Sequence, residues 1–458
     1  MKRRIQLSSR RDFIKIGTLS AAALALNRLF APRLFADEAQ VSARKKEPKA
    51  KAVIAIFLAG GPCHIDTFDP KPGAPRDLIG PYTKTSPTNV EGIEISQALP
   101  LTARHADKYS IIRGMTHKDN SHEISTYMML SGVPAGGELV YPSMGSVIAS
   151  KTAKKDGADL PSYISIMDPY SRFDESGFIG ESGRSFAASG IISRADLELE
   201  SKKKPRPSKI KSDADRIASR RDLLSALDAL RDCPSEEMQN ADAQRQTAYS
   251  MLIGNGKKAF DLSLEPQKVR EAYGAAKSGQ EKYFGQQLLL ARRLVEAGAT
   301  YVNVMLHGWD THKKHFEAMA TMLPALDKAY AALISDLHER GLLETTIVTL
   351  GGEFGRTPKI MYNTPWMGGR NHHGAAFSWV VAGGGFVGGN VVGRTDDTGS
   401  QVVERPVYPW DLSESIYTLT GVELNDTLPH PTGCVAHVVP PEVGEKPSGG
   451  MLSEIMKI

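Results

Sequence analysis

The sequence predicts an α/β fold, a three-layer α/β/α sandwich around a mainly parallel central sheet. Short runs of apolar and β-branched residues alternate with segments of helical period. The runs are apolar almost throughout, as strands covered on both faces are. The expected strands are 53–58, 109–112, 163–166, 301–306, 346–350 and 377–381, and the clearest helical periods lie at 286–297 and 313–340.

One large α/β domain is expected over residues 51–440. A polar, Lys-rich tether at 37–50 precedes it, and a C-terminal tail at 441–458 follows. The sequence SKKKPRP, at 201–207, breaks the pattern and introduces a charged, helical stretch. We expect residues 201–280 to form a helical insertion or cap within the domain, and we interpret their charges as a solvated face.

Residues 1–36 are typical of a twin-arginine signal peptide. The pair Arg10-Arg11 precedes a bulky apolar pair and a lysine, and Ala36 ends a small-residue cleavage site. The apolar stretch 16–26 is shorter than the ~20 residues that span a bilayer. We therefore expect export by the twin-arginine translocase to the periplasm or cell surface of a bacterium, with no stable membrane span after cleavage. An uncleaved anchor is the alternative.

The formal charge of +4 comes from this leader, which carries eight Lys or Arg and one Asp, so the remaining 422 residues have a net charge of −3. That remainder has no basic field to attract nucleic acid, so a nucleic-acid partner is not expected. The three cysteines, Cys63, Cys233 and Cys434, are too few for a disulfide framework. Such sparse cysteine usage suits a protein that folds in the reducing cytoplasm.

Polar clusters follow four of the expected strands, and a fifth cluster precedes the last one. They are GGPCHIDTFD at 60–69, THKDNSHE at 116–123, HGWDTH at 307–312, GGEFGRT at 351–357 and GRNHH at 369–373. Because ligands of open α/β sheets bind outside the carboxyl ends of the strands, we expect these clusters to meet at one place.

Eight of the twelve histidines lie in or beside these clusters: His64, His117, His122, His307, His312, His315, His372 and His373. Neutral imidazole and carboxylate are ligands of Zn, Mn or Fe, so the pattern favours a metal site. Asp66 and Asp69 have the alternative role of capping turns. Arg356 and Arg370 suit bidentate binding of an anionic substrate, or alternatively pair with Glu353 and hold the loops.

Five segments carry a resemblance to a known family: GGPCHIDTFDPKPG, HGWDTH, GGEFGRTP, GRNHHG and VAGGGFVGGNVVGRTDD. With these motifs the chain resembles, from about Lys51 to about Pro440, the exported DUF1501 proteins, distant relatives of the alkaline phosphatase and sulfatase superfamily. The resemblance implies a metal-dependent hydrolase of phosphate or sulfate esters, with an anionic ester as substrate and a divalent metal, Zn, Mn or Ca, as cofactor.

The resemblance also implies roles for individual residues. The implied metal ligands are Asp66, Asp310, His312, Glu353, His372 and His373. The segment from Ser121 to Gly132 is similar to the sulfatase helix that ends Leu-Leu-Thr-Gly, which places the nucleophile near Ser121 or His122. In that frame Ser121 is the nucleophile at a helix N-terminus, and His122 or His307 is the general acid or base. The implied substrate-binding residues are Arg356, Arg370 and His64.

Departures from the superfamily pattern bear on the activity. No cysteine lies in a Cys-x-Pro-Ser-Arg context, so no formylglycine is expected. Phe354 stands where an Asp-His dyad would have its His, and the family often has Ser at Cys63 and Asp at Asn371. These changes argue against a complete two-metal site. The alternative is therefore an exported, non-catalytic binding or structural protein that retains the fold.

Overall fold

The computed structural model describes residues 47–137, 139–152, 160–166, 176–188, 256–430 and 432–457. The expected leader, nearly all of the expected tether and residues 201–255 of the expected insertion lie outside these ranges. The elements named below belong to the unit Pro48–Ile458.

Among the described residues, eight strands form one sheet in the order β12-β4-β11-β8-β1-β7-β5-β6. Their bounds are β1 Ala52–Ala59, β4 Tyr109–Met115, β5 Tyr163–Ser165, β6 Phe186–Ala187, β7 Tyr301–His307, β8 Thr346–Gly351, β11 Phe377–Ala382 and β12 Asn390–Val392. Two-stranded sheets join β2 (Thr85–Pro87) to β3 (Glu94–Ser96), β9 (Gly355–Arg356) to β10 (His372–His373), β13 (Arg394–Thr395) to β14 (Val402–Glu404) and β15 (Thr427–Leu428) to β16 (Ala436–His437).

The sheet is mainly parallel, as the sequence predicts, and all six expected strands are present. The central strand β1 pairs in parallel with β7 and β8, and β7 pairs in parallel with β5. The exception is β11, which runs antiparallel to both β8 and β4. Its direction matters for function, because the start of β11 lies at the same edge of the sheet as the carboxyl ends of β1, β4, β7 and β8.

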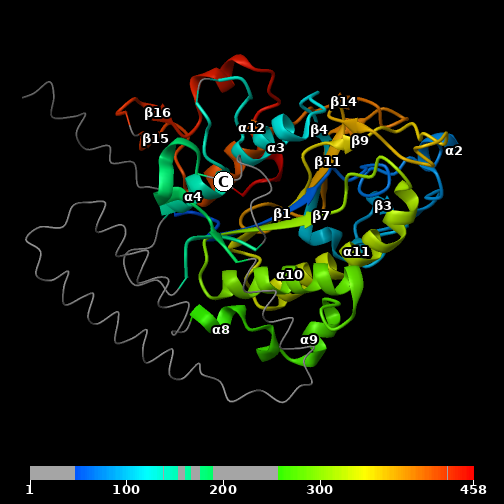
Figure 1. Ribbon diagram of the computed structural model, residues 1–458, viewed down its shortest axis with the longest axis horizontal. Helices are drawn as coiled ribbons and strands as arrows, with labels where there is room; N and C mark the ends of the chain where they lie inside the picture. Colours follow the sequence, from blue (N-terminus) through cyan, green and yellow to red (C-terminus); the bar gives the residue numbers. More distant parts are fainter. Residues whose placement is uncertain are drawn as a thin grey trace, which may run out of the picture. The chain divides into compact units, whose positions relative to one another are not determined.

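The sheet is the middle of three layers (Figure 1). Residues of β1 alternate between its two faces, because successive strand side chains point to opposite sides. Ile54 and Ile56 pack with residues of α10 (Gly279–Glu296) and α11 (His315–Glu339). Val53 and Phe57 pack on the other face, with residues of α3 (His122–Ser131), α4 (Met144–Thr152) and α12 (Pro409–Thr420). The expected α/β/α sandwich is therefore confirmed.

Helix boundaries follow local sequence. α12 begins at Pro409, whose fixed φ and missing N–H suit a first helical position, and ends at Gly421 in the left-handed region with φ 74°. α3 likewise ends at Gly132 with φ 71°. The other helices among the described residues are α2 (Arg76–Ile79), α8 (Gly256–Phe260), α9 (Gln267–Ala272) and short 3₁₀ helices at 102–108, 177–183, 262–264, 441–445 and 453–455. Both α8 and α9 lie in the described part of the expected insertion.

Residues 441–457, expected as a tail, pack against the body of the protein. Leu452 and Ile455 are buried. The Val387 amide donates to the Ile455 carbonyl at 2.8 Å, and the Lys457 amide donates to the Gly385 carbonyl at the same distance. In the part of the chain that the structure describes, no helix combines the length and the apolarity needed to cross a membrane.

Candidate functional site

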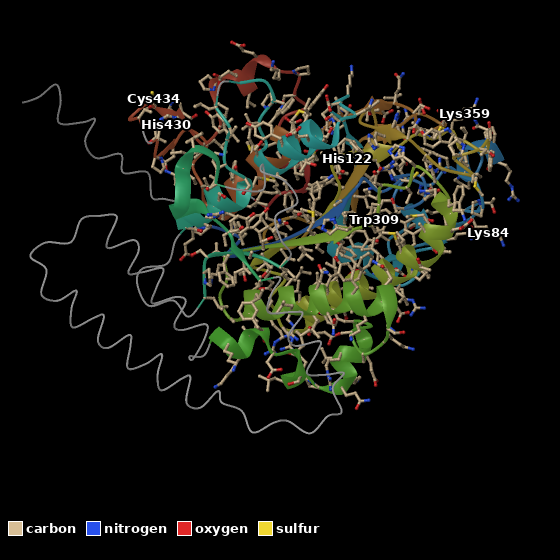
Figure 2. All side chains as sticks on the ribbon, in the orientation of Figure 1. Lys84, His122, Trp309, Lys359, His430 and Cys434 are labelled. Atoms are coloured by element: carbon tan, nitrogen blue, oxygen red, sulfur yellow. The ribbon has the colours of Figure 1, made fainter. Side chains whose placement is uncertain are left out.

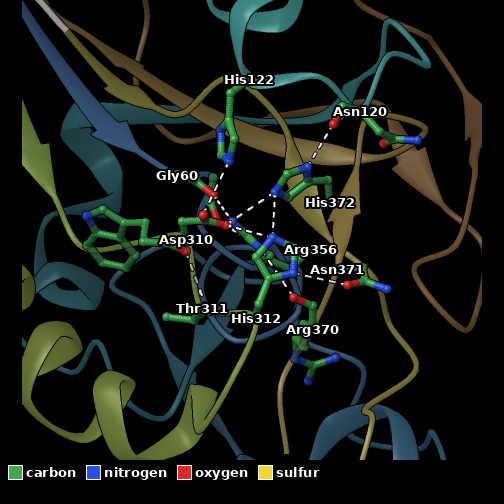
Figure 3. A network of polar contacts seen from close by, with 12 residues as sticks. Gly60, Asn120, His122, Asp310, Thr311, His312, Arg356, Arg370, Asn371 and His372 are labelled. Carbon is green, nitrogen blue, oxygen red and sulfur yellow. Dashed lines mark hydrogen bonds and ion pairs between the residues drawn. The ribbon is translucent and has the colours of Figure 1, made fainter. Parts of the chain in front are cut away.

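Five segments that are distant in the sequence meet at one edge of the sheet, as the chain topology requires. The loops after β1, β4, β7 and β8 leave the carboxyl ends of parallel strands, and the segment before β11 arrives at the same edge. They bring together His122 at the start of α3, Asp310 and His312 after β7, Glu353 after β8 and His372 in β10. Of the expected metal ligands, four therefore share one site, and His122 joins them. Figure 3 shows Asp310, His312 and His372 together with His122.

Asp310 is the centre of this group, and we call His122, Asp310, His312 and His372 the Asp310 cluster. Asp310 Oδ1 lies 3.1 Å from His312 Nε2 and 3.2 Å from His372 Nε2, and Oδ2 lies 3.4 Å from His122 Nε2. The Asp310 side chain is 45% exposed, so the cluster is open to solvent. Arg356, fully buried beneath it, pairs directly with Asp310.

In each of the three imidazoles the outer nitrogen, on the side away from Asp310, is Nδ1, and it contacts a hydrogen-bond acceptor. His372 Nδ1 donates to the carbonyl of Asn120 at 2.7 Å, and His122 Nδ1 donates to Glu353 Oε1 at 2.7 Å. His312 Nδ1 faces Asn371 Oδ1 at 3.1 Å. A neutral imidazole that donates through Nδ1 carries a lone pair on Nε2. The three Nε2 atoms therefore all face one carboxylate.

Glu353 fixes the geometry beneath His122. Its side chain is fully buried, and both of its oxygens accept the Gly60 amide, at 2.9 and 3.1 Å. The Glu353 carbonyl accepts from His117 Nε2 at 2.6 Å. Gly60 has φ 113°, and a Cβ at this position would overlap the Asp310 amide. The loop after β1 therefore approaches Asp310 through a position that only glycine fits.

The charges in the cluster influence one another. Burial raises the pKa of Asp310, but the hydrogen bond and charge of Arg356 outweigh burial and hold that pKa at about 2. The hydrogen bond from His122 to Glu353 raises the pKa of His122 above its usual value. Burial lowers the pKa of His372, so this imidazole stays neutral near pH 7. Asp310 is thus an anion in contact with one guanidinium and three imidazole rings.

A second, buried group contains Asp66, and we call Cys63, Asp66, Thr311, His315 and Arg370 the Asp66 cluster. His315 Nε2 donates to Asp66 Oδ2 at 2.6 Å, and the Thr311 hydroxyl lies 2.6 Å from His315 Nδ1. Arg370 Nη2 donates to Asp66 Oδ1 at 3.3 Å. Asp66, expected as a metal ligand, therefore binds a guanidinium and an imidazole instead of joining Asp310.

The two arginines expected to bind substrate hold loops together, the alternative role, although their carboxylate partners are Asp310 and Asp66 and not Glu353. Arg356 donates to the carbonyls of Gly60, Gly61 and Arg370 as well as to Asp310. Arg370 donates to the carbonyls of Leu78, Thr357 and Pro358 as well as to Asp66. Both side chains are fully buried.

His64 and His373 form a third group, with stacked rings whose centroids are 6.3 Å apart. His64 Nε2 donates to the Gly399 carbonyl and His373 Nε2 donates to the Ser400 carbonyl, both at 2.8 Å. Their ring nitrogens thus anchor the turn at 399–400.

Ser121 and His307, expected to carry the chemistry, both lie at element ends beside the cluster. Ser121 is exposed and precedes α3 as its N-cap, but its hydroxyl makes no capping hydrogen bond. His307 ends β7, and partial burial lowers its pKa, with Glu353 acting in the opposite direction.

Sequence reasoning assigned no role to Asn120, Thr311 or His315. Asn120 lies inside the THKDNSHE cluster and His315 among the eight grouped histidines, so the signal was their position. Their partners were not visible, because His372 and Asp66 lie about 250 positions away in the chain.

Fold and site together define a mixed α/β protein with a histidine–carboxylate centre at the carboxyl edge of its sheet. The chain belongs to the DUF1501 family, described as "Protein of unknown function (DUF1501)", which matches residues 50–442. The resemblance seen in the motifs is therefore confirmed. Among curated proteins none is detectably similar in sequence.

Solved structures show more distant likeness. Ps i-CgsB in complex with k-i-k-neocarrahexaose is 10% identical, with 82% of this chain and 73% of that chain covered and a TM-score of 0.37. Alkaline phosphatase from the Antarctic bacterium TAB5 is 10% identical, with 82% and 100% covered and a TM-score of 0.36. Phosphonate monoester hydrolase SpPMH from Silicibacter pomeroyi is 11% identical, with 83% and 75% covered and a TM-score of 0.33. Likeness at these TM-scores does not establish a shared activity.

Proposed function

We propose that this protein is a metal-dependent hydrolase of phosphate or sulfate esters, with the Asp310 cluster as its metal centre. One observation carries the proposal: three imidazoles whose outer nitrogens are occupied direct their Nε2 atoms at a single carboxylate. Imidazole nitrogens that face one carboxylate are held there by protons or by a cation that they share with it, and a shared cation accounts for all three at once. Outer acceptors that orient metal-binding histidines in this way are usual around metal ions.

His122, Asp310 and His372 each offer one ligand atom, and these atoms all lie within 4.8 Å of one another, so the three can hold one ion. Ligand bonds of ~2.0 Å in a tetrahedral site place neighbouring ligand atoms about 3.3 Å apart. The separations from Asp310 oxygens to the three Nε2 atoms are 3.1, 3.2 and 3.4 Å, and His312 Nε2 lies 2.9 Å from His372 Nε2. Mostly imidazole donors favour Zn or Mn over Ca, which prefers oxygen ligands.

The number of metal ions proposed is one. Phe354, where the superfamily dyad would have His, is fully buried, and its ring stacks on His372 with centroids 4.4 Å apart. Glu353, an expected ligand, instead orients His122 and the Gly60 amide. The apolar ring of Phe354 therefore occupies the side of the centre that would have to provide ligands for a second metal ion.

The residues of the chain divide the chemical work as follows. A bound metal would polarise the ester oxygens. Ser121, whose hydroxyl is free of capping, is proposed as the nucleophile at the N-terminus of α3, an end that favours anions. His307 is proposed to take and return the proton, because its lowered pKa leaves it neutral near pH 7 and His122 stands among the ligands.

One observation favours a second candidate, a non-catalytic binding or structural protein. Arg356 and Arg370, the expected anion-binding residues, are buried and occupied by carbonyls and carboxylates. A protein that binds metal but hydrolyses no ester would fit this second candidate.

The test is to purify the full chain, measure its metal content by elemental analysis, and assay an aryl phosphate and an aryl sulfate after loading with Zn or Mn. We expect about one metal per chain and measurable turnover. Ser121→Ala should abolish turnover and leave metal content unchanged, while Asp397→Asn, at an exposed turn, should change neither. A chain that takes up no metal would refute the proposal, and metal uptake without turnover would select the second candidate.

We also propose export by the twin-arginine route, based on the leader sequence alone. Replacing Arg10 and Arg11 with Lys should leave the precursor in the cytoplasm, because the translocase recognises the guanidinium pair. Cell fractionation followed by detection of the precursor and the processed chain measures the effect. Normal processing and export of that variant would contradict the proposal.

A further inference from the structure

The loop at residues 361–369 has large apolar side chains that are exposed or partly exposed. Of the four tryptophans, Trp309, Trp379 and Trp410 are 1%, 3% and 5% exposed, and Figure 2 shows Trp309 in the interior of the molecule. The fourth, Trp366, is partly exposed. Folding favours burial of large apolar side chains, so a group of them on the surface often belongs to a binding site.

Two neighbours of Trp366 extend the same surface. Tyr362 is 58% exposed and Met367 is 54% exposed. Met367 also has φ 50°, a left-handed conformation that is unfavourable for a residue with a side chain. An exposed apolar side chain and an unfavourable backbone conformation therefore coincide at Met367. Backbone strain that persists in a fold is common at functional sites.

This loop borders the Asp310 cluster. The ring of Trp366 lies 6.3 Å from the ring of His312, centroid to centroid, and the loop runs directly into Asn371 and His372. The apolar surface and the charged centre are therefore neighbours.

The loop is held rigidly in this place through backbone groups. The Met361 amide donates to the Gly369 carbonyl at 3.0 Å and the Gly368 amide donates to the Met361 carbonyl at 2.8 Å, which close the loop. The Lys314 amide donates to the Trp366 carbonyl at 3.1 Å. Gly369 packs so closely on the His312 carbonyl that a Cβ there would overlap it. The Trp366 ring is needed for none of these anchors.

We infer that residues 361–369 form a subsite for the organic part of the ester, and that this part is a ring with an apolar face, aryl or pyranose. The inference rests on the proposed function, which supplies the anionic group at the neighbouring centre. Aromatic and thioether side chains stack on ring faces, whereas a short alkyl chain gains little from them. A pre-ordered surface loses little entropy when it binds. The site therefore selects ring-bearing esters over alkyl esters.

The experiment compares two stable phosphonates that share an anionic head and differ in the ring. Calorimetry on the metal-loaded full chain should show phenylphosphonate binding at least about tenfold more tightly than methylphosphonate. Trp366→Ala should reduce this ratio to about twofold or less without changing methylphosphonate affinity, and Trp366→Phe should retain most of it. Leu264→Ala, which truncates another apolar side chain that is 57% exposed, is the matched control and should leave the ratio unchanged.

Glucose 6-sulfate distinguishes the two kinds of ring. Its binding with the same dependence on Trp366 would extend the subsite to pyranoses, and its failure to bind would restrict the subsite to aryl groups. Equal affinity for both phosphonates, or an unchanged ratio in Trp366→Ala, would overturn the subsite while leaving the metal centre intact. Failure of both phosphonates to bind would overturn the anion site and the subsite together.

Discussion

The Asp310 cluster and the Asp66 cluster each centre on an aspartate that contacts imidazole, but their surroundings are opposite. Each has an aspartate, an imidazole and an arginine in direct contact. The Asp66 side chain is fully buried, whereas the Asp310 side chain is 45% exposed. In the Asp66 cluster a single imidazole has a partner at both nitrogens, Asp66 and Thr311. In the Asp310 cluster three imidazoles direct the same nitrogen toward one carboxylate.

On our proposal, the direction of the side-chain contacts separates the proposed metal centre from a structural network. Cys63, Asp66 and His315 lie close enough together to hold an ion. However, Arg370 already supplies the positive charge, and burial raises the pKa of Cys63 to about 12, so its thiol stays protonated. A metal would have to displace a proton and compete with a guanidinium in that place.

The largest expected effect separates the two clusters by metal affinity. Asp310→Asn should lower affinity for Zn or Mn by more than about 100-fold, because changes even to groups behind the ligands cost 10–100-fold. Asp66→Asn should leave the affinity within about threefold of the wild type, provided that the variant folds. Competition against a chromogenic chelator measures both. Loss of the metal only in Asp66→Asn would reverse our assignment of the two clusters.

Stability should show the opposite order. Asp66→Ala leaves Arg370 buried without its partner and should reduce the free energy of unfolding by about 3–5 kcal/mol. Asp310→Ala in metal-free protein also removes the carboxylate of a buried arginine, but Asp310 is 45% exposed and Arg356 keeps three carbonyl acceptors, so the loss should be smaller, about 1–3 kcal/mol. Urea denaturation of both variants gives the comparison. Equal losses would mean that the Asp310 cluster also serves mainly to hold the fold.

A buried imidazole outside both clusters should make stability depend on pH. Burial lowers the pKa of His64 to about 4, so the folded state keeps this ring neutral. The unfolded chain takes up a proton near pH 6.5, so this stability is present above pH 6.5 and is lost as pH falls to about 4, by up to about 3 kcal/mol. His64→Gln should flatten that part of the profile, and His338→Gln, at an exposed position, should not. Identical slopes for wild type and His64→Gln would contradict the expectation.

The smallest expected effect concerns the acceptor behind His312. Asn371→Ala should weaken metal binding about tenfold, because His312 would lose the group that orients it. Asn371→Asp preserves an acceptor and should retain the wild-type affinity. Chelator competition measures the difference, and similar affinity in all three proteins would mean that Asn371 does not orient the ligand.

The sequence was sufficient to predict the main strands of the sheet and four of the residues that meet at its carboxyl edge. Apolar runs identified all six expected strands, and residues that follow strand ends were expected to converge. Asp310, His312, Glu353 and His372 do so, because each lies within a few residues of a strand that fixes its position.

The sequence was not sufficient to predict the direction of Asp66 in the loop after β1 or the roles of Arg356 and Arg370. Asp66 lies seven residues beyond the end of β1, so its direction depends on His315 and Arg370, which are 249 and 304 positions away. Arg356 and Arg370 looked equally suitable for an anion or a carboxylate. Only the carbonyl groups that the fold places around them decide between these roles.

The pairing of β1 also has a consequence for timing during synthesis. Ala52 of β1 pairs with Thr346 of β8, 294 positions later. At about 5–20 residues per second, a ribosome needs about 15–60 s to make that interval. Throughout it, an apolar strand destined for the centre of the sheet lacks at least one of its two neighbours and is exposed to aggregation and to chaperones. A route that exports only completed folds would keep the chain in the cytoplasm for this period, where such chaperones act.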